Sequence, residues 1–163
     1  MSRLDSAIRR LMAQRSCLDH AAEMIAGLPG HVLEFGLGNG RTYDHLRGLL
    51  PEREIYVFER EVRAHPDCIP DDSHLFLGDL HDTVGQAISR LGAGAALLHM
   101  DIGTGDEDRN ARFAAWLSGA IGPLLAPGAI VLSDQQLTLA GAEVLPLPDG
   151  VQPGRYYFYR FGG

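Results

Sequence analysis

The sequence contains no lysine, and all 14 of its basic residues are arginine. A Schiff base, a pyridoxal phosphate linkage and a Walker-type phosphate loop each need a lysine amine, so the sequence excludes these three kinds of site. Cysteine is also scarce, because only Cys17 and Cys68 occur, far apart and without the spacing of metal ligands. Neither a disulfide framework nor a zinc site is therefore indicated.

Long apolar runs are absent as well. No uninterrupted stretch approaches the ~20 residues that span a membrane, and residues 1–5 lack the apolar core of a signal sequence. We therefore expect a cytoplasmic protein without membrane contact. The formal net charge of -7 opposes binding to phosphate backbones, so nucleic acid is not an expected partner.

The length and composition are those of one domain. The 163 residues, of which 45% are hydrophobic and 21% charged, are enough to bury one core. We expect a single domain over 1–163, with an N-terminal helical segment over 1–29 and an α/β core over 30–163.

Three glycines at alternate positions follow the first apolar segment, residues 32–35, which carries Glu34 near its end. These glycines are Gly36, Gly38 and Gly40. Glycine permits positive φ and lets a flat ligand approach the backbone, and a helix beginning at residue 41 would present its amino end to that ligand. A dinucleotide fingerprint would need glycine or alanine where Arg41 stands, so NAD is not the expected cofactor.

Strands and helices alternate along the chain. Apolar runs predict strands over 31–36, 54–59, 74–79, 95–101 and 129–134, and apolar positions at helical steps predict helices over 41–50, 82–91 and 107–124. One long helix or two consecutive helices cover 3–28, and two prolines leave a short helix or a loop over 60–73. A turn rich in Pro, Asp and Gly between 142–147 and 155–161 predicts a terminal hairpin.

This pattern predicts an α/β fold of the Rossmann-like, three-layer sandwich type. Continuous apolar strands joined by helices favour a mainly parallel, seven-stranded sheet with helices on both faces and an extra N-terminal helix. We expect Pro127 and Gly128 to form a turn that leads into the fifth strand, and the C-terminal hairpin to be antiparallel.

Each of the first five predicted strands ends with a carboxylate: Glu34, Glu59, Asp79, Asp101 and Asp134. Ligands of such sheets lie outside the carboxyl ends of the strands, so we expect these side chains to surround a ligand. Glu59 lies 19 positions beyond Gly40, close to the offset of about 20 residues at which an acidic side chain meets ribose hydroxyls in dinucleotide sites.

Together these motifs resemble those of class I S-adenosylmethionine-dependent methyltransferases, and most of all the small stand-alone bacterial members. The resemblance covers about residues 30–161 and departs from the family pattern at the proline-broken 60–73 segment and the short 135–141 connection. It implies S-adenosylmethionine as the cofactor, S-adenosylhomocysteine as a product and methyl transfer as the activity.

The resemblance also implies roles for individual residues. Glu34, Gly36, Gly38 and Gly40 would form the glycine loop against the cofactor, and Glu59 would bind the ribose. Gly78, Asp79 and Leu80 resemble the motif whose acidic side chain accepts a hydrogen bond from the adenine amino group. Asp101 would lie near the methionine portion and the reacting methyl.

Methyl transfer from a sulfonium is an in-line displacement, to which an enzyme contributes positioning and, for some acceptors, a base. The candidates for that base are Asp101, His99, His81 and Asp134, and Asp101 leads. His99 faces the same side as Asp101 because side chains alternate along a strand. It lies one repeat deeper in an apolar strand, where a core histidine with a hydrogen-bond partner is favoured over a catalytic one.

Asp101, Asp134 and Gln135 end two strands that we expect to be neighbours, and oxygen ligands of this kind suit magnesium. Catechol-type O-methyltransferases have a similar set, from which the chain departs at Gln135. Two oxygen groups without fixed geometry do not define a metal site, so a rim carboxylate beside a polar loop is favoured over magnesium.

The acceptor is not identified by the sequence, and a small molecule is the expected one. Two alternatives stay open: a protein that binds S-adenosylmethionine without transferring a methyl group, and an aminopropyltransferase-like enzyme of the same fold. A homodimer could form through the N-terminal helix or through the aromatic segment 156–161, because aromatic and arginine side chains are enriched at contact surfaces. A strand with one buried face is an equally good interpretation of that segment.

Overall fold

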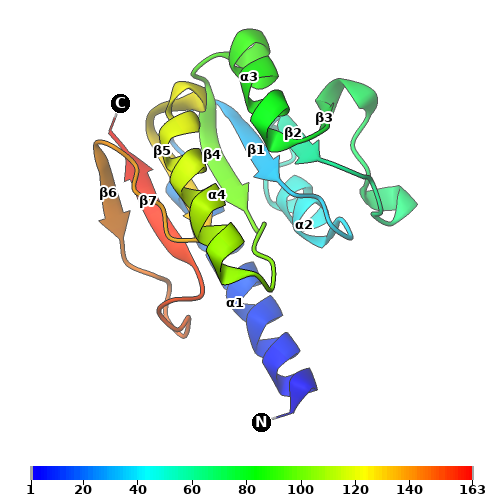
Figure 1. Ribbon diagram of the computed structural model, residues 1–163, viewed down its shortest axis with the longest axis vertical. Coiled ribbons are helices and arrows are strands. Elements are labelled where there is room, and N and C mark those ends of the chain that lie inside the picture. Colours follow the sequence, from blue (N-terminus) through cyan, green and yellow to red (C-terminus); the bar gives the residue numbers. More distant parts are fainter. Residues whose placement is uncertain (1, 163) are drawn as a thin grey trace.

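The computed structural model describes residues 2–162, which form a seven-stranded sheet with helices on both faces (Figure 1). The helices are α1 (Arg3–Met24), α2 (Arg41–Leu49), α3 (Leu80–Leu91) and α4 (Glu107–Ala120). The strands are β1 (His31–Phe35), β2 (Ile55–Glu59), β3 (Leu75–Leu77), β4 (Ala95–Met100), β5 (Leu125–Ser133), β6 (Ala142–Leu145) and β7 (Tyr157–Phe161). Short 3-10 turns cover Pro66–Cys68, Asp72–His74 and Gly122–Leu124.

The strand order is β3-β2-β1-β4-β5-β7-β6. Strands β1 to β5 are parallel to their neighbours, and β7 runs antiparallel to both β5 and β6. The chain leaves the sheet edge at β3 and returns to the centre at β4, so the direction of winding reverses between β1 and β4. This arrangement confirms the predicted Rossmann-like fold and its antiparallel C-terminal strands, and it places a crevice at the carboxyl ends of β1 and β4.

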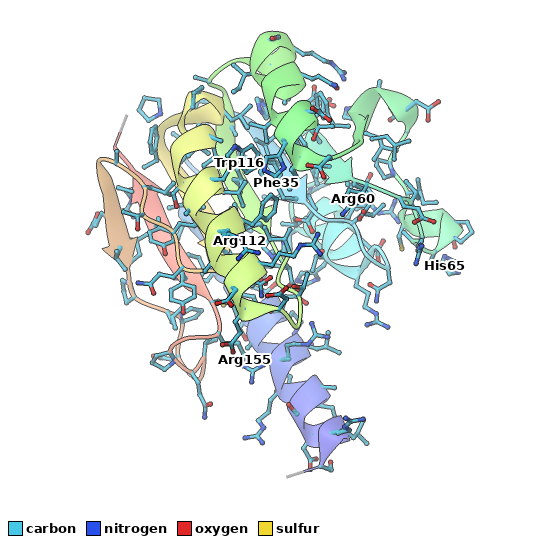
Figure 2. All side chains as sticks on the ribbon, viewed as in Figure 1. Phe35, Arg60, His65, Arg112, Trp116 and Arg155 are labelled. Atoms are coloured by element: carbon cyan, nitrogen blue, oxygen red, sulfur yellow. The ribbon has the colours of Figure 1, made fainter. Side chains whose placement is uncertain are left out.

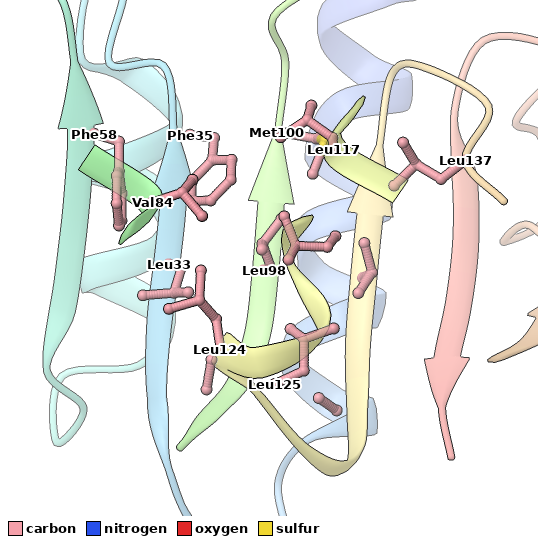
Figure 3. Close-up of a cluster of buried hydrophobic side chains, with 14 of the residues drawn as sticks. Leu33, Phe35, Phe58, Val84, Leu98, Met100, Leu117, Leu124, Leu125 and Leu137 are labelled. Atoms are coloured by element: carbon pink, nitrogen blue, oxygen red, sulfur yellow. The ribbon is translucent and has the colours of Figure 1, made fainter. Parts of the chain in front are cut away.

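Side chains alternate between two cores, one on each face of the sheet. Leu33, Phe35 and Leu98 point toward α3 and α4, where they pack with Leu117 (Figure 3). Residues of the other parity, such as Leu97, join a second core with α1 and α2. Figure 1 shows α3 and α4 in front of the sheet and α1 and α2 behind it.

The N-terminal segment is one helix of 22 residues, α1, and not two. It begins with a capping box, in which the Ser2 side chain accepts from the Asp5 amide and the Asp5 side chain accepts from the Ser2 amide. Its first half leaves apolar side chains exposed, notably Leu4 and Ile8. No helix within residues 2–162 combines the length and apolarity needed to cross a membrane.

The turn predicted at Pro127 and Gly128 is wrong, because β5 begins earlier, at Leu125. The strand accommodates Pro127 and Gly128 with a register shift against β4 and a positive φ of 84° at Gly128. Such an irregularity lets a proline lie within a strand without a missing ladder bond. Pairing with β4 therefore overrides the local turn preference.

The predicted departures from the family pattern are present in the structure. Two 3-10 turns cover part of 60–73, and no helix lies between β5 and β6. The connection after β5 is instead tied down by side chains: the Leu137 amide donates to the Tyr159 hydroxyl at 2.8 Å, and the Thr138 amide donates to Ser118 Oγ at 2.9 Å.

The C-terminal aromatic segment is built into the sheet. Tyr156, Phe158 and Tyr159 are 2%, 0% and 3% exposed, and β7 is paired on both sides. Of the two surfaces considered for self-association, only the first half of α1 keeps a contiguous apolar face accessible.

Arg53 joins α1 to the start of the sheet, because its guanidinium donates to the carbonyls of Ile25, Leu28 and Gly30 at 2.7, 2.7 and 2.8 Å. We expect Arg53→Lys to lower the free energy of unfolding by about 1–2 kcal/mol, since an ammonium cannot reproduce this planar fork. Urea unfolding measures the change. Arg15→Lys on the exposed face of α1 is the control, and equal stability of the two variants would contradict the expectation.

Candidate functional site

A cavity of about 550 Å³ lies at the carboxyl ends of the central strands. The loops that follow β1, β2, β3 and β4 form its floor, and α4 covers one side. Figure 2 labels two of the residues that line the cavity, Arg60 from the loop after β2 and Arg112 from α4. This position is the crevice at which α/β sheets of this topology bind their ligands.

Most of the residues predicted to bind a cofactor line this one cavity. They are Gly36, Gly38, Glu59, Gly78, Asp79, Leu80 and Asp101. The tertiary structure thus brings together loops from four strands. Glu34 and Gly40 do not line the cavity, and each has a different surrounding.

Glu59 organises the glycine loop through hydrogen bonds from backbone amides. Its Oε2 accepts from the amides of Leu37 and Gly38 at 2.8 and 3.1 Å, and its Oε1 accepts from the Arg60 amide at 2.7 Å. Burial acts to raise the pKa of Glu59, but these amides outweigh it and hold the pKa below its ordinary value. An ionised carboxylate fixed in this way can still accept hydrogen bonds from ligand hydroxyls.

Asp79 caps α3 at the edge of the cavity. Its Oδ1 accepts from the His81 amide at 2.9 Å and lies 2.7 Å from His81 Nδ1. Hydrogen bonds from the His81 backbone and side chain lower the pKa of Asp79.

The His81 ring packs on Trp116, with 4.0 Å between ring centroids, and near Phe113 at 5.5 Å. This aromatic group stands beside the acidic end of the cavity.

Asp101 lies just beyond β4 and faces α1. Gln14 Nε2 donates to Asp101 Oδ2 at 2.5 Å, and Arg10 Nη1 lies 3.9 Å from the same oxygen. Burial and the charge of Asp134 raise the pKa of Asp101, against the opposing effects of His99, Gln14 and Arg10. A carboxylate with a raised pKa is a stronger base than an ordinary one.

Glu34 is fully buried beneath the glycine loop and has no surface on the cavity. Its Oε2 lies 2.6 Å from Nδ1 of His99, which is also fully buried, and its other oxygen accepts from the Thr42 hydroxyl. The expectation that His99 is a core histidine with a partner fits this contact. His99 Nε2, however, has no partner among residues 2–162.

Gly40 is a packing position. A Cβ there would lie 2.4 Å from the Cys68 Cβ and 2.9 Å from the Cys68 carbonyl oxygen, and φ is +87°. Gly38 differs, because a Cβ there would meet nothing within 4 Å. The glycines therefore serve two purposes: Gly36 and Gly38 leave the cavity wall bare, and Gly40 lets the 64–68 segment approach α2.

The oxygens of Asp134 are occupied by the chain itself. Oδ1 accepts from the Ile102 amide at 3.2 Å, and Oδ2 accepts from the Gly103 amide and Gln135 Nε2 at 2.7 and 3.0 Å. In the part of the chain that the structure describes, no three His, Cys, Asp or Glu side chains are grouped to hold a metal ion. The contacts of Asp134 are those of a residue that orders the loop after β4.

Comparisons with known proteins agree with this geometry. A family model described as S-adenosyl-L-methionine methyltransferase matches residues 1–161. The chain belongs to this family. A search among curated proteins finds no significant match.

Solved structures show the same fold. The S-adenosyl-L-methionine methyl transferase from Silicibacter pomeroyi DSS-3 is 48% identical, with a TM-score of 0.93 and 99% of each chain covered. The Aeropyrum pernix fibrillarin with natively bound S-adenosyl-L-methionine is 18% identical, with a TM-score of 0.55 and 90% and 76% of the two chains covered. Human Methyltransferase-like protein 13, solved in complex with SAH, is 12% identical, with a TM-score of 0.58 and coverages of 95% and 82%.

The chain is thus an S-adenosylmethionine-dependent methyltransferase, and S-adenosylmethionine is its cofactor. Family membership favours methyl transfer over the two alternatives, binding without transfer and aminopropyl transfer. The cavity suits this cofactor, because bare glycine backbone, an ionised carboxylate and an aromatic group follow one another along its wall.

Sequence reasoning missed one wall of the methyltransferase site, which is formed by Thr104, Arg109, Asn110, Arg112 and Phe113. Apolar side chains at helical steps over 107–124 are typical of a helix that packs on a core, and Phe113 does pack against the core while also lining the cavity. The available signal was the glycine-rich loop at 103–106 before α4, which ends at the Asp106 cap.

The contact between Glu34 and His99 makes stability depend on pH. Burial would lower the pKa of His99, but the charge and hydrogen bond of Glu34 raise it above its ordinary 6.5. A raised folded-state pKa stabilises the fold below about pH 6.5, and this contribution is lost as pH rises through the folded-state pKa. We therefore expect the free energy of unfolding to fall as pH rises above about 6.5, as urea titrations at several pH values would measure.

Glu34→Gln is the matched variant for this measurement, because it removes the charge and keeps the shape. We expect it to lose about 3 kcal/mol near pH 6, where it leaves a buried histidine without its anion. The deficit should shrink as pH rises. A deficit independent of pH would contradict a charged His99.

The surroundings of Gly40 and Gly38 predict that alanine is tolerated less well at position 40 than at position 38. We expect Gly40→Ala to cost about 3 kcal/mol, because the new Cβ overlaps Cys68 in a left-handed conformation. Gly38→Ala should cost about 1 kcal/mol, since its φ of +53° is strained for alanine but its surroundings are open. Thermal unfolding of both variants compares them, and equal melting temperatures would show that the contact with Cys68 is not limiting.

Proposed function

We propose that this methyltransferase acts on a small-molecule acceptor, with the adenine beside Asp79 and Leu80, the ribose on Glu59 and the methyl group near Asp101. The observation that carries this proposal is that one cavity joins these three carboxylates along the backbone of Gly36 and Gly38. A cofactor laid across the strand ends would meet them in that order.

Each carboxylate has an electrostatic environment that suits its proposed role. Glu59 is held ionised, which suits a group that accepts from two ribose hydroxyls. The pKa of Asp79 is also lowered, as suits an acceptor for an adenine amino group. Asp101 alone has a raised pKa, and it stands where a proton of the acceptor would be removed.

Methyl transfer itself needs little from the protein beyond alignment. The cofactor carries the leaving group, so a pocket that holds acceptor, methyl and sulfur in line supplies much of the acceleration. The sulfonium charge disappears as the bond forms, so a contact between that charge and the Asp101 carboxylate would help to bind the cofactor but would not lower the barrier to transfer.

A small acceptor fits the charge of the protein. The formal net charge is -7, and Asp101 and Asp134 stand together at the strand ends beside the proposed methyl position. The net negative charge of the chain opposes binding to phosphate backbones, and so it favours small molecules over nucleic acids as acceptors.

Calorimetry on the wild type and on Glu59→Ala tests the cofactor placement. We expect the wild type to bind S-adenosylmethionine and S-adenosylhomocysteine but not NAD. Glu59→Ala should weaken both ligands at least ~10-fold, because it removes the ribose acceptor and frees the glycine loop. Glu61→Ala, an exposed neighbour paired with Arg63, is the control. Preference for NAD, or unchanged affinity in Glu59→Ala, would contradict the placement.

A further inference from the structure

Two arginines of α4 line the cofactor cavity and have no role in the placement of the cofactor. They are Arg109 and Arg112, and Figure 2 labels Arg112 where it extends from the helix. Residues three apart on a helix are neighbours on its surface, so the two guanidiniums reach the same wall of the cavity. Both side chains are exposed, and a ligand can therefore meet them from solvent.

Neither guanidinium has a hydrogen-bond or ion-pair partner within residues 2–162. Asp108 stands four residues before Arg112, a spacing at which opposite charges pair on a helix, yet the structure has no ion pair between them. The arginine ion pairs of the described chain are formed by Arg10, Arg47, Arg60, Arg63 and Arg160. Two neighbouring like charges destabilise a helix, and an anion bound between them removes that cost.

Asn110 fixes this wall relative to the reacting end of the site. Its Oδ1 accepts from the Thr104 amide and hydroxyl, both at 2.9 Å, and its Nδ2 donates to the Thr104 carbonyl at 2.8 Å. These three hydrogen bonds join α4 to the loop that follows β4, which starts at Asp101. The two arginines beside Asn110 therefore belong to a wall that begins near the proposed methyl position.

The cofactor offers this wall no anion. Phe113, four residues after Arg109, lies near His81 at the end of the cavity where the adenine is placed. Adenine and ribose are uncharged, and the sulfonium near Asp101 is a cation. The cofactor would therefore leave both arginines without a partner of opposite charge.

The acidic side chains of the cavity have other partners. Glu59 accepts from backbone amides, and Asp101 accepts from Gln14. Asp79 lies 3.9 Å from Arg60, the third arginine of the cavity. The α4 wall thus carries two surplus positive charges in a chain whose formal net charge is -7. A cleft that carries a local charge of one sign attracts ligands of the other sign.

We propose that Arg109 and Arg112 bind an anionic group, a carboxylate or a phosphate, on the methyl acceptor. This inference rests on the function proposed above, and it narrows the substrate class from small molecules in general to anionic ones. A guanidinium matches both kinds of anion through two parallel hydrogen bonds. The net charge of the chain opposes a polyanion, whereas a single anionic group meets only this basic wall.

The anionic group would orient the acceptor and take no part in the chemical step. The acceptor atom forms the new bond to the methyl carbon with its lone pair, and the electron pair of the carbon–sulfur bond returns to sulfur. The proton of the acceptor passes to Asp101, as proposed above. Arg109 and Arg112 are therefore positioning residues, which hold the acceptor in line with the methyl group.

Saturation-transfer NMR tests this inference on the protein saturated with S-adenosylhomocysteine. Acetate and acetamide are the probes, because they have nearly the same shape and differ in charge. At constant ionic strength, we expect acetate to bind the wild-type complex in the millimolar range and acetamide to bind at least ~10-fold more weakly. Inorganic phosphate should displace acetate, and the ratio of the two affinities shows which anion the wall prefers.

Variants assign the anion to the two arginines. We expect Arg109→Gln and Arg112→Gln each to weaken acetate binding ~10-fold, since each removes a charged donor pair. Calorimetry should show an unchanged affinity for S-adenosylhomocysteine in both. Arg112→Lys should keep part of the acetate affinity, because it retains the charge without the planar fork. Arg9→Gln, at an exposed position of α1, is the matched control.

The outcomes separate this inference from the cofactor placement. Acetate binding no tighter than acetamide binding, or acetate binding that both glutamine variants keep, would overturn the inference and leave the placement standing. Glutamine variants that also lose S-adenosylhomocysteine would show that the arginines hold the cofactor, which overturns the inference as well. A wild type that fails to bind S-adenosylhomocysteine would contradict the placement, and with it the inference.

Discussion

The contact between Glu34 and His99 underlies the whole site. It lies between β1 and β4, the two strands at which the sheet reverses its winding, and both side chains are completely buried. The Thr42 hydroxyl donates to the same carboxylate, so α2 is joined to the two strands as well. A desolvated pair of this kind tolerates little displacement, because an unpaired charge in the interior is costly. The loops that carry the glycines and Asp101 therefore start from fixed positions.

The carboxylates at the strand ends have different structural roles. Glu34 holds strands together, Glu59 orders the glycine loop through backbone amides, Asp79 caps a helix, and Asp134 orders the loop after β4. Asp101 has a raised pKa, and its hydrogen bond and its ion pair both come from α1. Carboxylates at some strand ends thus stabilise the fold by accepting hydrogen bonds from the chain. At others, a carboxylate oxygen is left to accept a hydrogen bond from a ligand. The difference comes from how many donors each carboxylate meets.

Much of the fold could be predicted because its signals are local. Apolar runs and helical spacing marked the elements, and the offset between Gly40 and Glu59 predicted that Glu59 lies beside the glycine loop, where it accepts from the Leu37 and Gly38 amides. The signals failed where a contact from a distant segment outweighs local preference. Pro127 and Gly128 favour a turn, yet pairing with β4 continues the strand through them. Phe113 reads as a core residue, yet it also faces the cavity, because α4 lies over the strand ends.

What the sequence determined by itself was the alternation of elements, the family and the kind of cofactor, since spacing along the chain is enough to place a glycine loop and the acidic residue that follows it. Only the tertiary structure decided which of these residues line the cavity. Gly40 packs against Cys68 and Glu34 turns inward to His99, whereas Arg10 and Gln14, which carry no motif, arrive beside Asp101. The physical reason is that side-chain direction and the packing of α1 on the sheet depend on contacts between segments far apart in the chain.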